Sequence, residues 1–144
     1  MQTRTNEDVI LDLFSAIEER DRERILAIYH PEVEFHWPAA LPYGGSSTRL
    51  GEPGAPTWQE CWLPVQPTAA ERSMDCRIIA SRGDEVVAVY HQRGRDQSGN
   101  VVDDEVMGLY KLDGGKLRRA QMFYFNLDAV VSFLAPAEAP GEGQ

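Results

Sequence analysis

The segment between Asp84 and Asn126 constrains the fold most, because it alternates strand-forming residues with glycine turns. The expected strands cover 85–93, 101–112 and 116–126. Both faces of this antiparallel meander carry apolar side chains, whereas a meander with one solvent-exposed face alternates cleanly between apolar and polar residues. We therefore expect both faces to be covered, one by helices of the same chain and the other by a second copy of the protein.

The N-terminal third predicts the helical cover. Apolar side chains recur at helical spacing over 6–20, and Asp21 is the expected N-cap of a second helix that ends before Pro31. A half-buried strand is expected over 32–37. Residues 39–57 are rich in glycine, proline and serine, which is typical of a loop that covers a binding site. The other expected elements are a short helix around Trp58, Cys61 and Trp62, a strand over 72–81 and a helix over 128–134.

Charge and hydropathy narrow the classes of partner. The chain has 23 acidic and 14 basic side chains and a formal net charge of −9, which argues against nucleic acid or an anionic membrane as its partner. No apolar stretch is long enough to span a bilayer. Glu7, Asp8 and Asp12 interrupt the N-terminal apolar residues, so we expect no signal peptide.

The length of the chain suits one domain with a substantial core. We expect residues 1–134 to form this single domain, and the composition of 135–144, APAEAPGEGQ, predicts a disordered tail. Two cysteines, Cys61 and Cys76, do not make a disulfide framework. They are interpreted as reduced thiols in a cytoplasmic protein.

Two segments carry a resemblance to a known superfamily. The segment DRERILAIYHPEVEFHWP is similar to the helix–turn–strand unit of the nuclear-transport-factor-two-like superfamily, in its SnoaL-like and ketosteroid-isomerase-like branch. The segment LDGGKLRRAQMFYFNLDAV is similar to that branch's last turn, strand and helix. The resemblance spans 6–134 and implies an α+β fold, in which a curved, mixed and mostly antiparallel sheet forms a cone-shaped half-barrel around N-terminal helices. It also implies a hydrophobic pocket and, usually, a dimer.

The resemblance leaves the activity open, because the superfamily includes isomerases, epoxide hydrolases, polyketide cyclases, dehydratases and non-catalytic binders. By the resemblance, Leu13 occupies the position of the catalytic tyrosine of ketosteroid isomerases, and Trp37 occupies the position of their catalytic carboxylate. Neither side chain can transfer a proton in that mechanism. Asn126 stands where polyketide cyclases usually carry an aspartate, and an amide orients a substrate but is not a base. Tyr29 matches the branch's supporting tyrosine at the end of the second helix. Steroid isomerisation by that route is therefore not expected.

One carboxylate on the meander is a candidate for acid–base chemistry. The expected turns place Arg93 opposite Val101 and Leu112 opposite Lys116. With these pairings Tyr90, Asp104 and Tyr124 form one cross-strand row. The row on one side of it is Gln92, Val102 and Asn126, and the row on the other side is Ala88, Val106 and Met122. A carboxylate between two phenols and beside an apolar floor has a raised pKa and can act as a general acid or base. The alternative is that Asp104 belongs to a solvated acidic run and that the two tyrosines line a pocket or pack in the core.

Other side chains are candidates for ligand binding or for assembly. The expected ligand-binding residues are Tyr29, Trp37, Trp58, Trp62, Gln92, Tyr110, Met122 and Asn126. The tryptophans among them suit a pocket wall and ordinary core packing equally well. The opposite face of the meander is the expected homodimer interface, formed by Val87, Val89, His91, Met107, Leu109, Phe123 and Phe125.

We expect no metal and no cofactor. No pair of histidines has ligand spacing such as HxxxH, and the chain lacks a phosphate-binding loop, a dinucleotide-binding GxGxxG and a GxSxG motif. The sequence favours a cofactor-free isomerase, cyclase or dehydratase that acts by proton transfer on a hydrophobic cyclic or polyketide-like molecule. In this interpretation Asp104 moves the proton while Tyr90 and Tyr124 bind a carbonyl or enolate. The alternative is a module of the same fold that binds a hydrophobic ligand or assembles as a dimer without catalysis.

Overall fold

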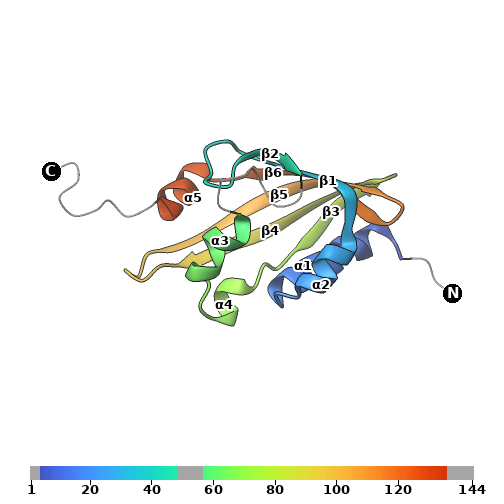
Figure 1. The fold of residues 1–144 in the computed structure, drawn as a ribbon. Coiled ribbons are helices and arrows are strands. Elements are labelled where there is room, and N and C mark those ends of the chain that lie inside the picture. Colours follow the sequence, from blue (N-terminus) through green and yellow to red (C-terminus); the bar gives the residue numbers. More distant parts are fainter. Residues whose placement is uncertain (1–3, 49–56, 136–144) are drawn as a thin grey trace.

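The computed structural model describes residues 4–48 and 57–135 and contains one curved sheet with helices packed inside it (Figure 1). In chain order the elements are α1 (Asn6–Glu18), α2 (Arg22–Ile28), β1 (Tyr29–Trp37), β2 (Gly45–Thr48), α3 (Trp58–Trp62), the 3-10 helix η1 (Leu63–Val65), α4 (Ala69–Arg72), β3 (Arg77–Arg82), β4 (Glu85–Arg95), β5 (Val101–Asp113), β6 (Lys116–Tyr124) and α5 (Leu127–Leu134). The six-stranded sheet has the order β2-β1-β6-β5-β4-β3. Only β1 and β6 pair in parallel, so the sheet is mixed and mostly antiparallel. The expected tail lies outside the described residues from residue 136 onward.

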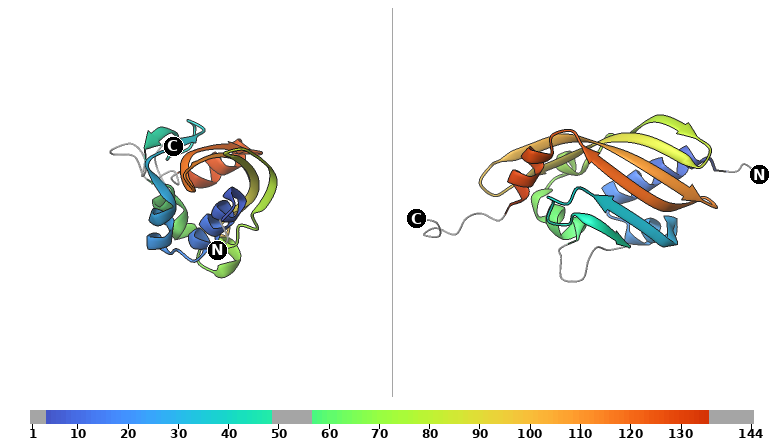
Figure 2. Two further views of the ribbon diagram at one scale, coloured as in Figure 1. Left: turned by 90° about the vertical axis from the view of Figure 1, so that its right-hand side faces the viewer. Right: turned by 90° about the horizontal axis from the view of Figure 1, so that it is seen from above.

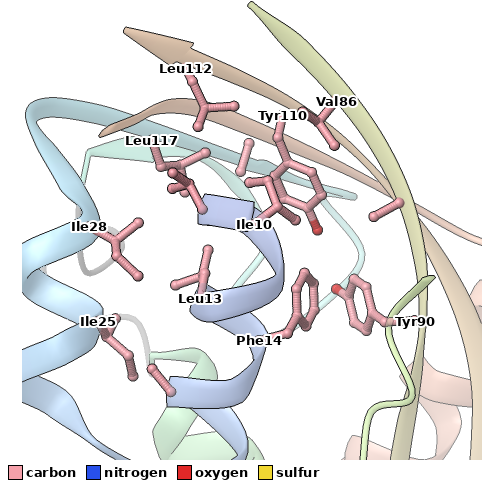
Figure 3. Close-up of a cluster of buried hydrophobic side chains, with 14 of the residues drawn as sticks. Ile10, Leu13, Phe14, Ile25, Ile28, Val86, Tyr90, Tyr110, Leu112 and Leu117 are labelled. Atoms are coloured by element: carbon pink, nitrogen blue, oxygen red, sulfur yellow. The ribbon is translucent and has the colours of Figure 1, made fainter. Parts of the chain in front are cut away.

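The sheet wraps around α1, which fills the concave side of the half-barrel (Figure 2). A capping box starts this helix: Oγ1 of Thr5 accepts from the N–H of Asp8 at 3.0 Å, and the Asp8 carboxylate accepts from the N–H of Thr5 at 3.2 Å. Ile10 and Phe14 then face the sheet, Leu13 lies toward Ile28 of α2 (Figure 3), and all three are buried. The α+β half-barrel around N-terminal helices is therefore confirmed.

The first hairpin of the meander is longer than expected. Arg95, rather than Arg93, lies opposite Val101. The turn closes tightly, because the N–H of Asp96 donates to the carbonyl of Asn100 at 2.9 Å. This pairing shifts the register of β4 against β5 by two residues.

The second hairpin also closes more tightly than expected. Gly114 and Gly115 both have positive φ, as a two-residue type I′ turn requires, and Asp113 pairs with Lys116. The expected turn had three residues. The shorter turn shifts the register of β5 against β6 by one residue from the expected pairing. A bulge next to the turn shifts it by one more, so the register along the rest of the hairpin differs by two residues.

The expected row of Tyr90, Asp104 and Tyr124 is therefore wrong. Tyr90 and Tyr124 lie opposite Val106 from the two flanking strands, and Asp104 lies opposite Gln92. Because a shift of two residues preserves which face a side chain occupies, the even-numbered side chains of β4 and β5 still point into the half-barrel and are buried.

Two clusters of buried side chains fill the half-barrel. The larger one joins α1, α2 and the sheet. The smaller one lies beneath α3 and α5 and is formed by Leu41, Tyr43, Trp62, Val102 and Val130. Trp62 is fully buried there, and its ring lies against Phe133 and close to Gly94. Trp62 therefore belongs to the core of this end of the domain.

The outer face of the meander is only partly apolar. Leu109, Phe123 and Phe125 are exposed, with 36%, 46% and 58% of their surface accessible, as expected for uncovered apolar residues. Val89 differs, since only 3% of it is accessible. An ion pair of 3.1 Å between Arg77 on β3 and Glu105 on β5 crosses β4 beside Val89 and accounts for this burial.

Two segments differ from the expected loops and strands. The segment after Pro38 returns as β2 and pairs with β1, with Gly45 opposite Trp37. The strand expected over 72–81 begins only at Arg77, because Thr68 caps the short helix α4 before it. Within the described residues, no helix is long and apolar enough to cross a membrane.

Candidate functional site

The half-barrel encloses a cavity of about 80 Å³ between α1, β1, the meander and the start of α3. Aromatic and aliphatic side chains dominate its lining, which consists of Leu13, Phe14, Ile17, Tyr29, Phe35, Trp37, Thr57, Trp58, Gln59, Met74, Tyr90, Tyr110, Leu117, Ala120 and Met122. The described lining holds no carboxylate, imidazole, amine or thiol. Its polar side-chain groups are hydroxyls, the indole N–H groups of Trp37 and Trp58 and the amide of Gln59.

Tyr29, Tyr90 and Tyr110 line the cavity, and within the described residues none of their three hydroxyls makes a hydrogen bond. Tyr90 and Tyr110 project from β4 and β5 beside Phe14 on α1, and their hydroxyls point toward its ring (Figure 3). The ring centroid of Phe14 lies 4.8 Å from that of Tyr90 and 6.1 Å from that of Tyr110. Burial raises the pKa of Tyr90 and of Tyr110 well above 10, so both are neutral hydrogen-bond donors.

The aromatic wall on the other side of the cavity comes from β1 and α3. The rings of Phe35 and Trp37 are stacked at 5.2 Å, and Tyr29 packs against Phe35. Burial raises the pKa of Tyr29 to about 12. Trp58 closes the wall, and its Nε1–H donates to Oε1 of Gln92 at 3.2 Å.

Gln92 lies behind Trp58 and outside the cavity lining. The side chain is fully buried, and its Nε2 has no hydrogen-bond partner within the described residues. The bond from Trp58 fixes which end of the amide is the acceptor, since an indole N–H only donates. Gln92 therefore positions Trp58 from inside the barrel.

Asp104 is buried but does not line the cavity. Both of its carboxylate oxygens lie 3.1 Å from the N–H of Asn126, which donates to them. Asn126 in turn caps α5, because its Oδ1 accepts from the N–H of Ala129 at 3.3 Å. Burial raises the pKa of Asp104, while these backbone donors act in the opposite direction. Asp104 thus connects β5 to the start of α5.

Tyr124 belongs to a hydrogen-bonded chain at the narrow end of the barrel. Its hydroxyl lies 2.6 Å from that of Tyr43, which accepts from Nε1–H of Trp62 at 3.0 Å. Burial raises the pKa of both tyrosines well above the ordinary value. These three side chains form a polar contact inside the second core cluster.

The structure therefore divides the residues expected at the site into two groups. The cavity lining includes Tyr29, Trp37, Trp58, Tyr90, Tyr110 and Met122. The residues that lie outside the described lining are Trp62, Gln92, Asp104, Tyr124 and Asn126. The sequence interpretation missed Phe14, Phe35 and Met74, although helical spacing and strand alternation already placed Phe14 and Phe35 on buried faces.

Asp103 on the outer face contacts two basic side chains. His91 Nδ1 lies 2.7 Å from the Asp103 carboxylate, which Arg93 also contacts at 3.1 Å. In the part of the chain that the structure describes, no three histidine, cysteine, aspartate or glutamate side chains come close enough to hold a metal ion.

A curved α+β half-barrel of this kind is the cystatin-like fold. The SnoaL-like domain family matches residues 10–120, and the chain belongs to this family. No curated protein matches the sequence.

Solved structures show the same fold. A protein of unknown function with a cystatin-like fold from Xanthomonas campestris is 20% identical with a TM-score of 0.75, covering 92% of this chain and 100% of its own. A putative SnoaL-like polyketide cyclase from Jannaschia sp. CCS1 is 16% identical with a TM-score of 0.63, covering 94% and 99%. TerC, co-crystallised with polyporic acid, is 20% identical with a TM-score of 0.63, covering 90% and 97%.

Proposed function

We propose that this protein binds a hydrophobic, ring-containing small molecule in the half-barrel and donates hydrogen bonds from Tyr90 and Tyr110 to an oxygen of that molecule. The observation that carries the proposal is the cavity lining, in which these two unpartnered hydroxyls stand among aromatic and aliphatic side chains. Apolar walls with a few convergent polar groups are typical of small-molecule sites. A carbonyl or phenolic oxygen between the two hydroxyls satisfies both donors.

The lining favours binding over proton transfer. A general base must reach the proton that it removes, and the described lining offers only tyrosines as ionisable groups. Since burial raises the pKa of Tyr90 and Tyr110, their phenolate forms are scarce near neutral pH. This supports the non-catalytic interpretation of the site more strongly than the isomerase or cyclase interpretation.

Catalysis with Asp104 remains the second candidate, and one observation favours it. Burial raises the pKa of Asp104, and the carboxylate is close enough to raise the pKa of Tyr90 in its turn. A general acid needs this kind of environment. A substrate would have to enter beyond Trp58 and Gln92 to reach it.

Two structural neighbours are consistent with a ring-containing ligand. TerC was co-crystallised with polyporic acid, and the Jannaschia protein is named a putative polyketide cyclase. Because both are 20% identical or less to this chain, they support its fold alone, and the ligand of this chain is inferred from its own cavity lining.

The binding proposal is tested with the neutral fluorophore N-phenyl-naphthylamine, whose emission rises in an apolar site. Ile17 lies on α1 where the cavity opens, so Ile17→Trp should fill the opening and weaken binding about tenfold or more. Leu11→Trp is the matched control, because Leu11 is 42% accessible on the same helix and does not line the cavity. Equal affinities for the two variants would contradict the proposal.

The two candidates are separated by different variants. Tyr90→Phe and Tyr110→Phe should weaken binding of a carbonyl-bearing ligand without destabilising the fold, because neither hydroxyl makes a hydrogen bond to the described residues. Asp104→Asn should leave ligand affinity unchanged. A substrate that is turned over by the wild type and lost in Asp104→Asn would establish the enzymatic candidate instead.

A further inference from the structure

A second and wider hollow opens directly outside the cavity, and we call it the vestibule. Its volume is about 510 Å³, and it shares Ile17, Tyr29, Thr57, Trp58 and Gln59 with the inner cavity. The inner cavity of about 80 Å³ is smaller than a typical small-molecule site of roughly 300–1,000 Å³, whereas cavity and vestibule together reach that range. A ligand whose ring enters the half-barrel therefore extends into the vestibule.

The vestibule wall carries an arginine that forms no ion pair with the described residues. Arg20 is half-buried, and its Nη2 donates to Oε1 of Gln66 at 3.0 Å, which is a neutral partner. Within the described residues no carboxylate forms an ion pair with Arg20, whereas the half-buried Arg24 and Arg93 each pair with carboxylates. Burial, together with the charge of Arg72, lowers the pKa of Arg20. A partly buried cation of this kind is stabilised when an anion joins it.

The backbone and a buried amide hold Arg20 in place. The residue adopts a φ of 56°, and its N–H donates to the carbonyl of Ile17 at 3.0 Å where α1 ends. Its partner Gln66 is only 5% accessible and donates through Nε2 to the carbonyl of Arg93 at 3.0 Å. The guanidinium is therefore fixed at the vestibule wall before any ligand arrives, which lowers the entropic cost of binding.

The remaining vestibule charges do not neutralise Arg20. Arg22 is exposed in the same lining. Glu60 is the one carboxylate of the described lining, and its Oε1 accepts from the N–H of Thr57 at 2.9 Å in the capping box of α3. The other side chains that widen the vestibule are the apolar Ile25, Leu26 and Leu63. A local positive site thus adjoins an apolar channel in a chain whose net charge is −9.

We infer that the ligand is an amphipathic anion, with its ring in the half-barrel and a carboxylate or similar acidic group against Arg20. This inference rests on the proposed binding of a hydrophobic molecule in the cavity. The negative charge of the whole chain repels small anions in general, so that only an anion whose ring is also buried gains enough from the site.

A matched pair of fluorophores tests the inference. Anilinonaphthalene sulfonate carries an acidic group on the ring skeleton of N-phenyl-naphthylamine, which is neutral. Arg20→Met should weaken binding of the sulfonate on the order of tenfold, through loss of a charge-assisted contact, and leave binding of the neutral probe unchanged. Arg119→Met is the control, because Arg119 is an exposed arginine outside both hollows that also contacts a glutamine, Gln121, at 3.4 Å. This control should change neither affinity.

The outcomes separate the inference from the function on which it rests. Unchanged sulfonate binding in Arg20→Met, with the neutral probe still bound, overturns the anion site and leaves the hydrophobic site intact. Failure of the wild type to bind the neutral probe overturns the proposed function itself. If Arg20→Met does not fold, two further measurements decide. Added salt should weaken the binding of the sulfonate, but not of the neutral probe, to the wild type. Arg20→Lys should retain most of the wild type's affinity for the sulfonate. Salt-independent sulfonate binding would again overturn the inference.

Discussion

The position of the Tyr110 ring depends on Gly108, and this dependence gives a quantitative prediction. The two residues point to the same face of β5, and the Tyr110 ring lies back over Gly108. A Cβ at position 108 would stand 2.5 Å from Cε2 of Tyr110 and closer still to its hydroxyl. Gly108→Ala must therefore move the ring, which packs against Phe14 and the rest of the core at the edge of the cavity.

Overpacking of this kind costs about 1–3 kcal/mol in the free energy of unfolding. With a urea slope of about 2 kcal/mol per molar, the unfolding midpoint of Gly108→Ala should fall by roughly 0.5–1.5 M. Tryptophan fluorescence during urea titration measures this midpoint, because Trp37, Trp58 and Trp62 report on the barrel interior.

A double-mutant cycle isolates the contact. Tyr110→Ala removes the ring and costs about 3–5 kcal/mol by itself. In that background Gly108→Ala should be neutral or slightly stabilising, since alanine restricts the unfolded chain more than glycine does. The coupling energy should therefore be about 1–3 kcal/mol. If Gly108→Ala costs the same in both backgrounds, or nothing in the wild type, the ring position described for Tyr110 is refuted.

Three further predictions concern Asp104, the Tyr43–Trp62 contact and the outer face. Because burial raises the pKa of Asp104 above 3.8, its ionised form destabilises the fold, and the stability that its protonated form contributes is lost as pH rises through the raised pKa. The unfolding free energy of Asp104→Asn relative to that of the wild type should therefore be higher at about pH 7 than at about pH 3. The same difference between the two proteins at both pH values would contradict this. Tyr43→Phe leaves the buried Nε1–H of Trp62 without its acceptor and should cost about 1–3 kcal/mol in urea unfolding, whereas an unchanged midpoint would mean that the contact contributes nothing. If the exposed Phe123 and Phe125 form the expected homodimer interface, light scattering should give a dimer for the wild type and a monomer for Phe123→Asp, and a monomeric wild type would remove that interface.

The faces of the meander could be predicted from the sequence, but the pairing across its strands could not. Alternation along a strand is local, so the even-numbered residues of β4 and β5 were correctly assigned to the inside. Which residues stand opposite one another depends on turn geometry. The turn at Gly114 and Gly115 has two residues instead of three, and the bulge beside it restores the face while moving Tyr124 from Asp104 to Val106.

The difference between local and long-range information also explains which of the candidate site residues were correctly predicted to line the cavity. Tyr90 and Tyr110 do so because the face of a strand residue is a local property. Trp58 and Trp62 belong to the same short helix, yet one lines the cavity and the other packs under α5. Their sorting depends on how α3 docks, a long-range arrangement that no periodicity within five residues specifies. The vestibule arises in the same way, since Arg20 and Gln66 meet across 46 positions of sequence.

The methionines provide the most direct test of the claim that the half-barrel interior is the binding site. Met74 and Met122 line the cavity, whereas Met107 lies on the outer face of β5. In a protein labelled with carbon-13 at its methionine methyl groups, added N-phenyl-naphthylamine should shift the Met74 and Met122 signals and leave Met107 in place. Signals from Met74 and Met122 that stay fixed while Met107 shifts would place the hydrophobic site on the outer face and contradict the account.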